Sequence, residues 1–178
     1  MKIGVISDTH ISNRMTNVKQ LASRLINRVA TTADELVEIV RPHFAGADLI
    51  IHAGDWVNWA VVEALEELAP VEGVAGNMDP YEVSSRLPAR KVISAGGKKI
   101  GIIHGSGNPH GMEVRLRREF EAVDLIVFGH SHHSFFAPVN AIPMFNPGSP
   151  TDQRWAPVRS IGIIHLDQEI RAEVIPLD

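Results

Sequence analysis

The stretch Lys2-Ile3-Gly4-Val5-Ile6-Ser7-Asp8-Thr9-His10 is a short apolar run that ends in a polar turn. Apolar runs of this length that stop at a polar residue are typical of buried strands. Asp48–His52 repeats the pattern and is followed by Gly54-Asp55, and Val71–Ala75 is followed by Gly76-Asn77-Met78-Asp79. We therefore predict three strands, each with a carboxylate or an amide in the loop at its carboxyl end.

Helical patterns separate these strands. Apolar residues recur at helical spacing in three stretches: Val18–Val29, Leu36–Phe44 and Val61–Leu68. The second stretch follows Thr32 and Glu35, which have the spacing of a capping box. We expect its helix to end around Arg41-Pro42, because proline lacks the N–H that a helix needs. Strands that alternate with helices favour right-handed βαβ units and a parallel sheet.

The second half of the chain is richer in strand patterns. Paired apolar runs on either side of Gly96-Gly97, Asn140 and Asp167-Gln168 predict three hairpins. Leu125–Phe128 predicts a further buried strand. The apolar spacing between Met112 and Val123 predicts one more helix.

The composition excludes several classes of protein. The chain has 178 residues, of which 44% are hydrophobic and 21% charged, with a net charge of −4 and no cysteine. This rules out global disorder, a disulfide framework and thiolate metal ligands. No stretch approaches the roughly 20 apolar residues of a membrane span, and the first apolar run meets an acid too early for a signal peptide, so we expect a cytoplasmic protein. The acidic balance argues against nucleic acid as the main partner.

Five of the predicted strands end in loops that carry Asp, Asn or His. Ligand sites of open α/β sheets lie outside the carboxyl ends of the strands, so we expect these loops to converge. Imidazole and carboxylate suit Zn, Fe, Mn, Co and Ni, and seven ligands, one of them an amide, fit two ions that share a carboxylate better than one tetrahedral ion. Each motif alone is a common turn, and only the joint pattern indicates a metal site. The seven side chains are Asp8, His10, Asp55, Asn77, His104, His130 and His132.

In this order the motifs resemble the calcineurin-like metallophosphoesterase superfamily, and most closely its small single-domain bacterial and archaeal phosphodiesterase branch. The resemblance runs from Met1 to about Ser149. It implies an α/β fold of two mixed β-sheets packed as a sandwich and flanked by helices, in four layers. It also implies a single domain over 1–178, with a helical insertion at about 14–45. The family has five motifs in a fixed order: D-x-H, G-D, G-N-x-D, H-G and G-H-x-H. This chain matches them, in the same order, with Asp8-Thr9-His10, Gly54-Asp55, Gly76-Asn77-Met78-Asp79, His104-Gly105 and Gly129-His130-Ser131-His132. The later stretch Asn146-Pro147-Gly148-Ser149 also looks like the small branch.

The resemblance further implies a binuclear site with two divalent ions per chain, for which Mn, Fe, Zn and Ni are the candidates. One ion would bind Asp8, His10, Asp55 and His132. The other would bind Asp55, Asn77, His104 and His130, so that Asp55 would bridge the pair. A hydroxide shared by the ions would attack phosphorus in line, and Asp55, Asn77 and Asp79 would carry the catalysis.

The sequence departs from the family pattern at Met78. Many members have there a His that protonates the leaving group, and the small branch often has Cys. Methionine has no proton to give, so we expect weaker hydrolysis of esters with poor leaving groups. His110 and His133 are candidate replacements, although each is more often a surface residue. Substrate contacts are expected from Asn13, Arg14 and His110.

The leading prediction is a phosphodiesterase that acts on a small phosphate ester. A phosphomonoesterase or a nucleotide pyrophosphatase would use the same motifs and is kept as an alternative. A non-catalytic protein-binding scaffold is the second alternative, since a eukaryotic retromer subunit has this fold. Loss of metal ligands would mark a scaffold, and this chain keeps all seven. No membrane partner is expected, and formation of a homo-oligomer is left open.

Overall fold

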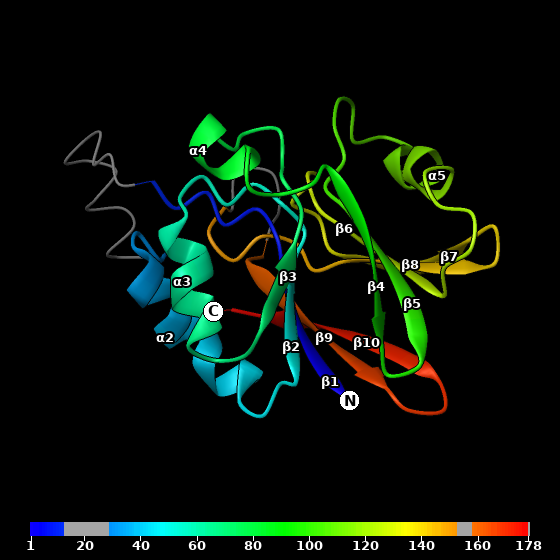
Figure 1. Ribbon diagram of the computed structural model, residues 1–178, viewed down its shortest axis with the longest axis horizontal. Coiled ribbons are helices and arrows are strands. Elements are labelled where there is room, and N and C mark those ends of the chain that lie inside the picture. Colours follow the sequence, from blue (N-terminus) through cyan, green and yellow to red (C-terminus); the bar gives the residue numbers. More distant parts are fainter. Residues whose placement is uncertain (13–28, 153–157, 178) are drawn as a thin grey trace.

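The computed structural model describes residues 1–12, 29–152 and 158–177. Figure 1 shows the arrangement of its helices and strands. The elements in chain order are β1 Lys2–Ile6, α2 Ala33–Phe44, β2 Leu49–His52, α3 Ala60–Glu66, β3 Val71–Gly73, α4 Tyr81–Ser84, β4 Arg90–Ala95, β5 Lys98–Ile103, α5 Met112–Arg117, β6 Leu125–Phe128, β7 Phe135–Val139, β8 Ile142–Asn146, β9 Ser160–Leu166 and β10 Ile170–Pro176.

The described strands form two sheets of five. The first has the order β10-β9-β1-β2-β3 and the second has the order β4-β5-β6-β8-β7. In the first sheet β1, β2 and β3 are parallel, as the alternation of strands and helices predicts, whereas β9 and β10 are antiparallel additions. In the second sheet β5, β6 and β8 are parallel, and the predicted hairpins β4–β5 and β7–β8 form its edges. Both sheets are mixed, so the predicted fold class is confirmed.

Three apolar clusters hold four layers together. Ile3 and Val5 of β1 pack with Ile100 and Ile102 of β5 between the two sheets. The opposite face of the first sheet is covered by α2 and α3, and α5 covers the outer face of the second sheet (Figure 1). Ile6 belongs to the cluster under α2 and α3, because successive side chains of a strand point to opposite faces.

Helix α2 begins at the predicted capping box and continues through its proline. Thr32 Oγ1 accepts the N–H of Glu35 at 3.2 Å, and the Glu35 carboxylate accepts the N–H of Thr32 at 3.3 Å. The prediction of an end around Arg41-Pro42 was wrong, because the helix extends to Phe44. The Phe44 ring is buried against the first sheet, and this packing stabilises the last turn despite the hydrogen bond that proline omits.

Two other helix predictions have different outcomes. Helix α5 ends at Arg117, earlier than the predicted Val123, although Phe120 and Val123 still pack in the α5 cluster from the loop that follows. The stretch Val18–Val29 lies outside the described residues except for Val29, as does most of the expected insertion before α2. Among the described helices, none has the length and apolar character needed to cross a membrane.

Gly4 allows α2 to pack closely on the central strand of the first sheet. A Cβ atom added at Gly4 would lie 2.8 Å from Cδ1 of Phe44. Carbon atoms prefer separations of about 3.5–4.0 Å, so the Phe44 ring would have to move. Phe44 is one of the largest fully buried side chains, and it has little room to do so.

We predict that Gly4→Ala lowers the free energy of unfolding by about 1–3 kcal/mol, because it overpacks this contact. Urea denaturation measures the change. Phe44→Leu removes the ring edge, so the double variant should lose less stability than the sum of the two single losses. Strictly additive losses would contradict the assigned contact.

Candidate functional site

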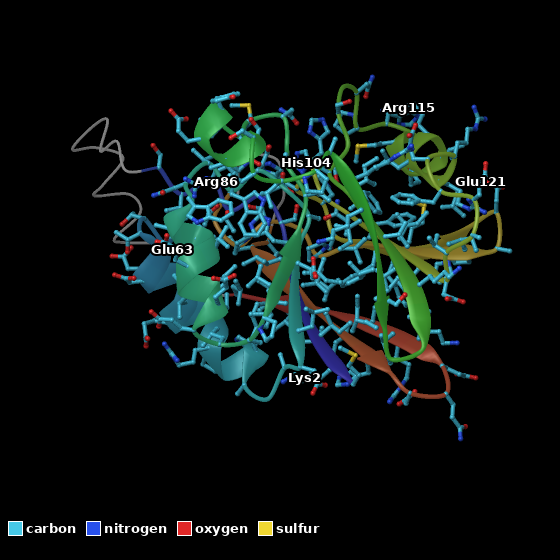
Figure 2. All side chains as sticks on the ribbon, viewed as in Figure 1. Lys2, Glu63, Arg86, His104, Arg115 and Glu121 are labelled. Atoms are coloured by element: carbon cyan, nitrogen blue, oxygen red, sulfur yellow. The ribbon has the colours of Figure 1, made fainter. Side chains whose placement is uncertain are left out.

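The polar loops that follow β1, β2, β3, β5 and β6 converge at one edge of the sandwich. Backbone hydrogen bonds join loops that are far apart in sequence. The N–H of Asp8 donates to the carbonyl of Gly54 at 3.0 Å, and the N–H of Gly129 donates to the carbonyl of His104 at 3.1 Å. Figure 2 shows His104 well inside the molecule, above the strands of both sheets. The predicted convergence of the loops is therefore observed.

Most of the predicted metal ligands have a left-handed backbone conformation. Residues other than glycine rarely adopt a positive φ. This backbone conformation costs of order 1–3 kcal/mol in free energy, and it persists only where the surrounding structure holds it. A concentration of these residues at one place is typical of functional sites. The residues and their φ angles are Asp8 at 56°, His10 at 46°, Asp55 at 60°, His130 at 71° and His132 at 58°.

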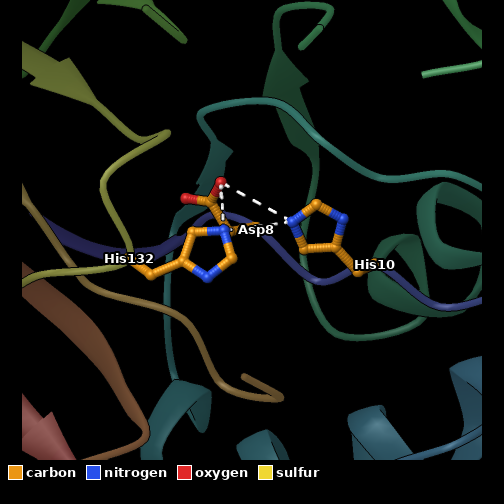
Figure 3. Close-up of side chains that lie close together, drawn as sticks. All are labelled: Asp8, His10 and His132. Carbon is orange, nitrogen blue, oxygen red and sulfur yellow. Dashed lines mark hydrogen bonds and ion pairs between the residues drawn. The ribbon is translucent and has the colours of Figure 1, made fainter. Parts of the chain in front are cut away.

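Asp8, His10 and His132 form the first group of candidate ligands, drawn in Figure 3. Oδ1 of Asp8 lies 3.3 Å from Nε2 of His132 and 3.9 Å from Nε2 of His10. The two Nε2 atoms are 3.2 Å apart. One carboxylate oxygen and two ring nitrogens thus face a common point, which is the arrangement that a transition-metal ion requires.

Asp8, Asp55 and His104 form the second group. Nε2 of His104 lies 3.2 Å from Oδ2 of Asp55 and 3.9 Å from Oδ1 of Asp8. The same Oδ2 of Asp55 lies 3.6 Å from Nε2 of His10, which belongs to the first group. Asp8 belongs to both groups, and Asp55 links the second group to His10 of the first.

Each of the two carboxylates is held by hydrogen bonds that fix its direction. Oδ2 of Asp8 accepts the hydroxyl of Ser7 at 2.5 Å and the N–H of His130 at 3.0 Å. Oδ1 of Asp55 accepts the N–H of Met78 at 2.7 Å. These bonds leave Oδ1 of Asp8 and Oδ2 of Asp55 turned toward the imidazole rings.

The cluster has an excess of negative charge, which the pKa shifts reflect. Burial of His104 and His132 would lower the pKa of each ring, but the carboxylates of Asp55 and Asp8 raise it above the ordinary value. Burial of Asp55 would raise its pKa, but the adjacent His104 ring lowers it overall. Burial lowers the pKa of His10, which leaves that ring neutral and able to bind a cation.

The remaining two candidate ligands, Asn77 and His130, lie at the rim of the cluster. Nε2 of His130 is 2.9 Å from the carbonyl of Gly107, which leaves Nδ1 as the nitrogen available to a metal. Both residues line a cavity of about 460 Å³ that opens onto the two groups. The described residues around this cavity are His10, Asp55, Asn77, Met78, Pro109, His130, Ser131, His132 and His133.

Asp79 lies beside this cluster and joins two of its loops. Its Oδ1 accepts the N–H of Val57 at 2.7 Å, and its Oδ2 accepts the N–H of Gly76 at 2.8 Å. Burial raises the pKa of the Asp79 carboxyl. Val57 has a φ of 68°, which is costly for a β-branched residue, and the bond to Asp79 helps to hold it there.

The structure describes one of the three residues from which substrate contacts are expected. His110 lies outside the main cavity and lines a neighbouring one. Asn13 and Arg14 lie outside the described residues. The cavity beside the candidate ligands therefore takes its described lining from the loops after β1, β2, β3, β5 and β6 alone.

Asp152 is a site residue that the sequence analysis missed. Its Oδ2 lies 3.2 Å from Nδ1 of His132, so it orients the ring whose Nε2 faces Asp8. A carboxylate behind a metal-binding histidine fixes the ring and raises its basicity. The signal was weak, because Asp152 follows β8 in a polar loop that resembles an ordinary turn.

His52 is a buried residue that holds two loops of the site together. It is fully buried, and its Nδ1 accepts the N–H of Gly54 at 3.1 Å while its Nε2 lies 3.1 Å from Oγ1 of Thr9. Since Nδ1 is an acceptor, the proton is on Nε2, and burial keeps the pKa of the ring well below its usual range. His52 therefore links the loop after β1 to the loop after β2, with its ring stacked on Trp56 at 3.5 Å between centroids.

The donor set fits divalent cations. Nε2 of His104 is buried, and within the described part of the chain it makes no well-directed hydrogen bond, although two carboxylate oxygens face it. A buried polar atom without a partner is costly, and a cation between this nitrogen and the carboxylates would satisfy all of them. Oxygen and imidazole nitrogen without sulfur favour Mn, Fe, Zn or Ni over a structural thiolate site.

Several known proteins are similar to this chain over most of its length. The chain is 35% identical to a probable metallophosphoesterase of Methanocaldococcus jannaschii, over 100% of this chain and 82% of the relative. It is 25% identical to a phosphodiesterase of the same organism, over 98% of this chain and 99% of that protein. The solution structure of a Thermotoga maritima protein superposes with a TM-score of 0.67 at 31% identity and covers 99% of each chain. Residues 1–169 match the calcineurin-like phosphoesterase superfamily domain, and the chain belongs to this family.

Proposed function

We propose that the protein is a phosphodiesterase that depends on two divalent metal ions. The observation that carries the proposal is the position of Asp55, whose Oδ2 lies within 3.6 Å of His10 and 3.2 Å of His104. One ion would be held by Asp8, His10, Asp55 and His132. The other would be held by Asp55, Asn77, His104 and His130.

The metal ions and the side chains of the protein would make different contributions to the hydrolysis. When bound, a pair of divalent ions supplies positive charge for a phosphoryl group and lowers the pKa of a shared water. Asp8 and Asp55 offset part of that charge, and the amide of Asn77 adds an oxygen donor without further negative charge. The site would then remain positive overall and attract an anionic ester. Asp79 and Asp152 keep the loops and the His132 ring in position.

A diester is the preferred substrate for two reasons. A relative that aligns over almost the whole chain is named as a phosphodiesterase. The main cavity also has further space on either side of it. One flanking cavity shares Pro109, Ser131 and His133 with it, and the other shares Met78. A phosphodiester has two organic groups to accommodate, whereas a monoester has one.

A phosphomonoesterase or nucleotide pyrophosphatase would use the same ligands, and substrate comparison separates these activities. A protein-binding scaffold is less well supported. All seven candidate ligands are present, whereas the loss of ligands would mark a scaffold. The proposed substrate is a small phosphate ester, and the proposed location of the protein is the cytoplasm.

Met78 is expected to shape the choice of leaving group. Its side chain is 59% exposed at the wall of the main cavity, next to Asn77. A thioether cannot donate a proton, so departure of an alkoxide would receive no help from this position. Aryl esters with acidic phenols need no such help.

We predict that Asp55→Asn reduces hydrolysis of bis(4-nitrophenyl) phosphate by at least about 10³-fold and lowers the bound metal per chain. The amide removes a negative charge and can present only one oxygen. Activity with added Mn²⁺ and elemental analysis measure the two effects. Asp167→Asn, an exposed carboxylate paired with Arg171, is the matched control and should retain both metal and activity. Full activity in Asp55→Asn would exclude the proposed site.

We also predict that Met78→His raises kcat on alkyl phosphodiesters about tenfold or more and leaves aryl diesters nearly unchanged. General acid catalysis contributes about 10²–10⁴-fold where the acid is well placed. The measured quantity is the ratio of kcat on an alkyl diester, dimethyl phosphate, to kcat on an aryl diester, bis(4-nitrophenyl) phosphate. Met78→Gln is the control, because it is polar and similar in size but is not an acid. An unchanged ratio in Met78→His would disprove the assigned role of this position.

A further inference from the structure

A second cavity of about 310 Å³ adjoins the main cavity. Pro109, Ser131 and His133 line both of them, so the two spaces share a wall at the loops after β5 and β6. None of the candidate metal ligands lines the second cavity. We call this space the side cavity, and it is lined by Pro109, His110, Met112, Glu113, Phe128, Ser131, His133, Ser134 and Phe135.

The lining of the side cavity combines aromatic and apolar side chains with a polar rim. Phe128 and Phe135 meet edge to face with 5.9 Å between ring centroids. Phe128 and Met112 are buried at 2% and 1% exposure, so the apolar surface open to a ligand comes from Pro109, which is exposed, and from Phe135, which is partly buried. An aromatic ring forms favourable contacts with a flat organic group. Ser134 and His133 are exposed and offer hydrogen bonds at the rim.

The charge of the side cavity selects against anions. Glu113 is the one carboxylate among the described lining residues, and no lysine or arginine is among them. The nearest guanidinium in sequence, that of Arg115, is directed to backbone carbonyls: it donates to Asn108 at 2.6 Å and to His110 at 3.1 Å. Figure 2 shows Arg115 on α5, at the outer side of the molecule. Arg115 thus braces the loop that carries Pro109 and His110.

We propose that the side cavity binds one organic group of the substrate phosphodiester, and that this group is neutral and aromatic or apolar. The inference rests on the proposed function, because it takes the phosphate to lie in the main cavity. It narrows the substrate class, since a monoester with a small leaving group would leave the side cavity unused. A nucleotide pyrophosphate substrate would bring a second anionic group toward Glu113.

Calorimetric titration tests the proposal without requiring turnover. The protein, loaded with Mn²⁺, is titrated with methyl phenyl phosphate and with dimethyl phosphate, which carry the same charge and differ in one organic group. We expect the phenyl ester to bind about tenfold more tightly, because burial of a ring removes apolar surface from water. Methyl 4-carboxyphenyl phosphate should lose most of this advantage, and Glu113→Gln should restore part of it.

Ser134→Trp fills the side cavity from an exposed position, so it should fold normally and abolish the preference for phenyl. Two matched tryptophan variants locate the effect: Glu121→Trp lies outside both cavities, and Glu82→Trp lies in the cavity on the other side of Met78. Both should keep the phenyl preference of the wild type.

Equal affinity of the wild type for the phenyl and methyl esters would overturn the proposal. Retention of the preference in Ser134→Trp, or its loss in Glu82→Trp, would also overturn it. If Ser134→Trp fails to fold, the wild-type comparison of the phenyl, methyl and carboxyphenyl esters still decides. Binding without hydrolysis of any ester would count against the proposed function alone. Hydrolysis without a phenyl preference would count against the side cavity alone.

Discussion

The arrangement of the site follows from the burial of two carboxylates at one edge of the sandwich. Asp8 and Asp55 are 0% and 2% exposed, and both direct an oxygen toward His104. Buried like charges are costly unless hydrogen bonds and opposite charges offset them. The backbone N–H groups of His130 and Met78 supply part of this compensation, and the imidazole rings supply another part. The remaining negative charge is what makes the cluster suited to divalent cations.

The two-sheet architecture brings these groups together from distant parts of the chain. β1 and β2 pair in parallel, with Ile6 opposite His52, so the loops that carry Asp8 and Asp55 leave the first sheet at the same level. β5 and β6 do the same in the second sheet, with Ile103 opposite Phe128, and deliver His104 and His130. Apolar packing between the sheets sets the distance between the two pairs of loops. Asp8, Asp55 and His130 have a left-handed backbone, as does Val57, whose conformation is held by a hydrogen bond to Asp79.

Substrate choice is expected to depend on residues outside this shared framework. Met78 and Pro109 form walls of the main cavity, and neither side chain has a proton to donate. The side cavity adds Phe128 and Phe135, which belong to the layer between the second sheet and α5. Thus the layer between the second sheet and α5 also contributes to the space that a substrate would occupy. Relatives with the same ligands and different residues at these walls would accept different esters.

The sequence by itself determined the order of the described strands, the polar loops that follow five of them and the candidate ligand set, whereas the short helix α4 was not predicted. Apolar periodicity is local, and Asp-x-His, Gly-Asp and Gly-His-x-His can be recognised as short motifs. The extension of α2 past Pro42 was not predictable, because it depends on the packing of Phe44 over Gly4. Asp152 was missed because its role depends on His132, twenty positions earlier in the chain. Only the tertiary structure decided which carboxylate oxygen faces which ring and where the two cavities adjoin, because these features arise from contacts between loops that the sequence keeps far apart.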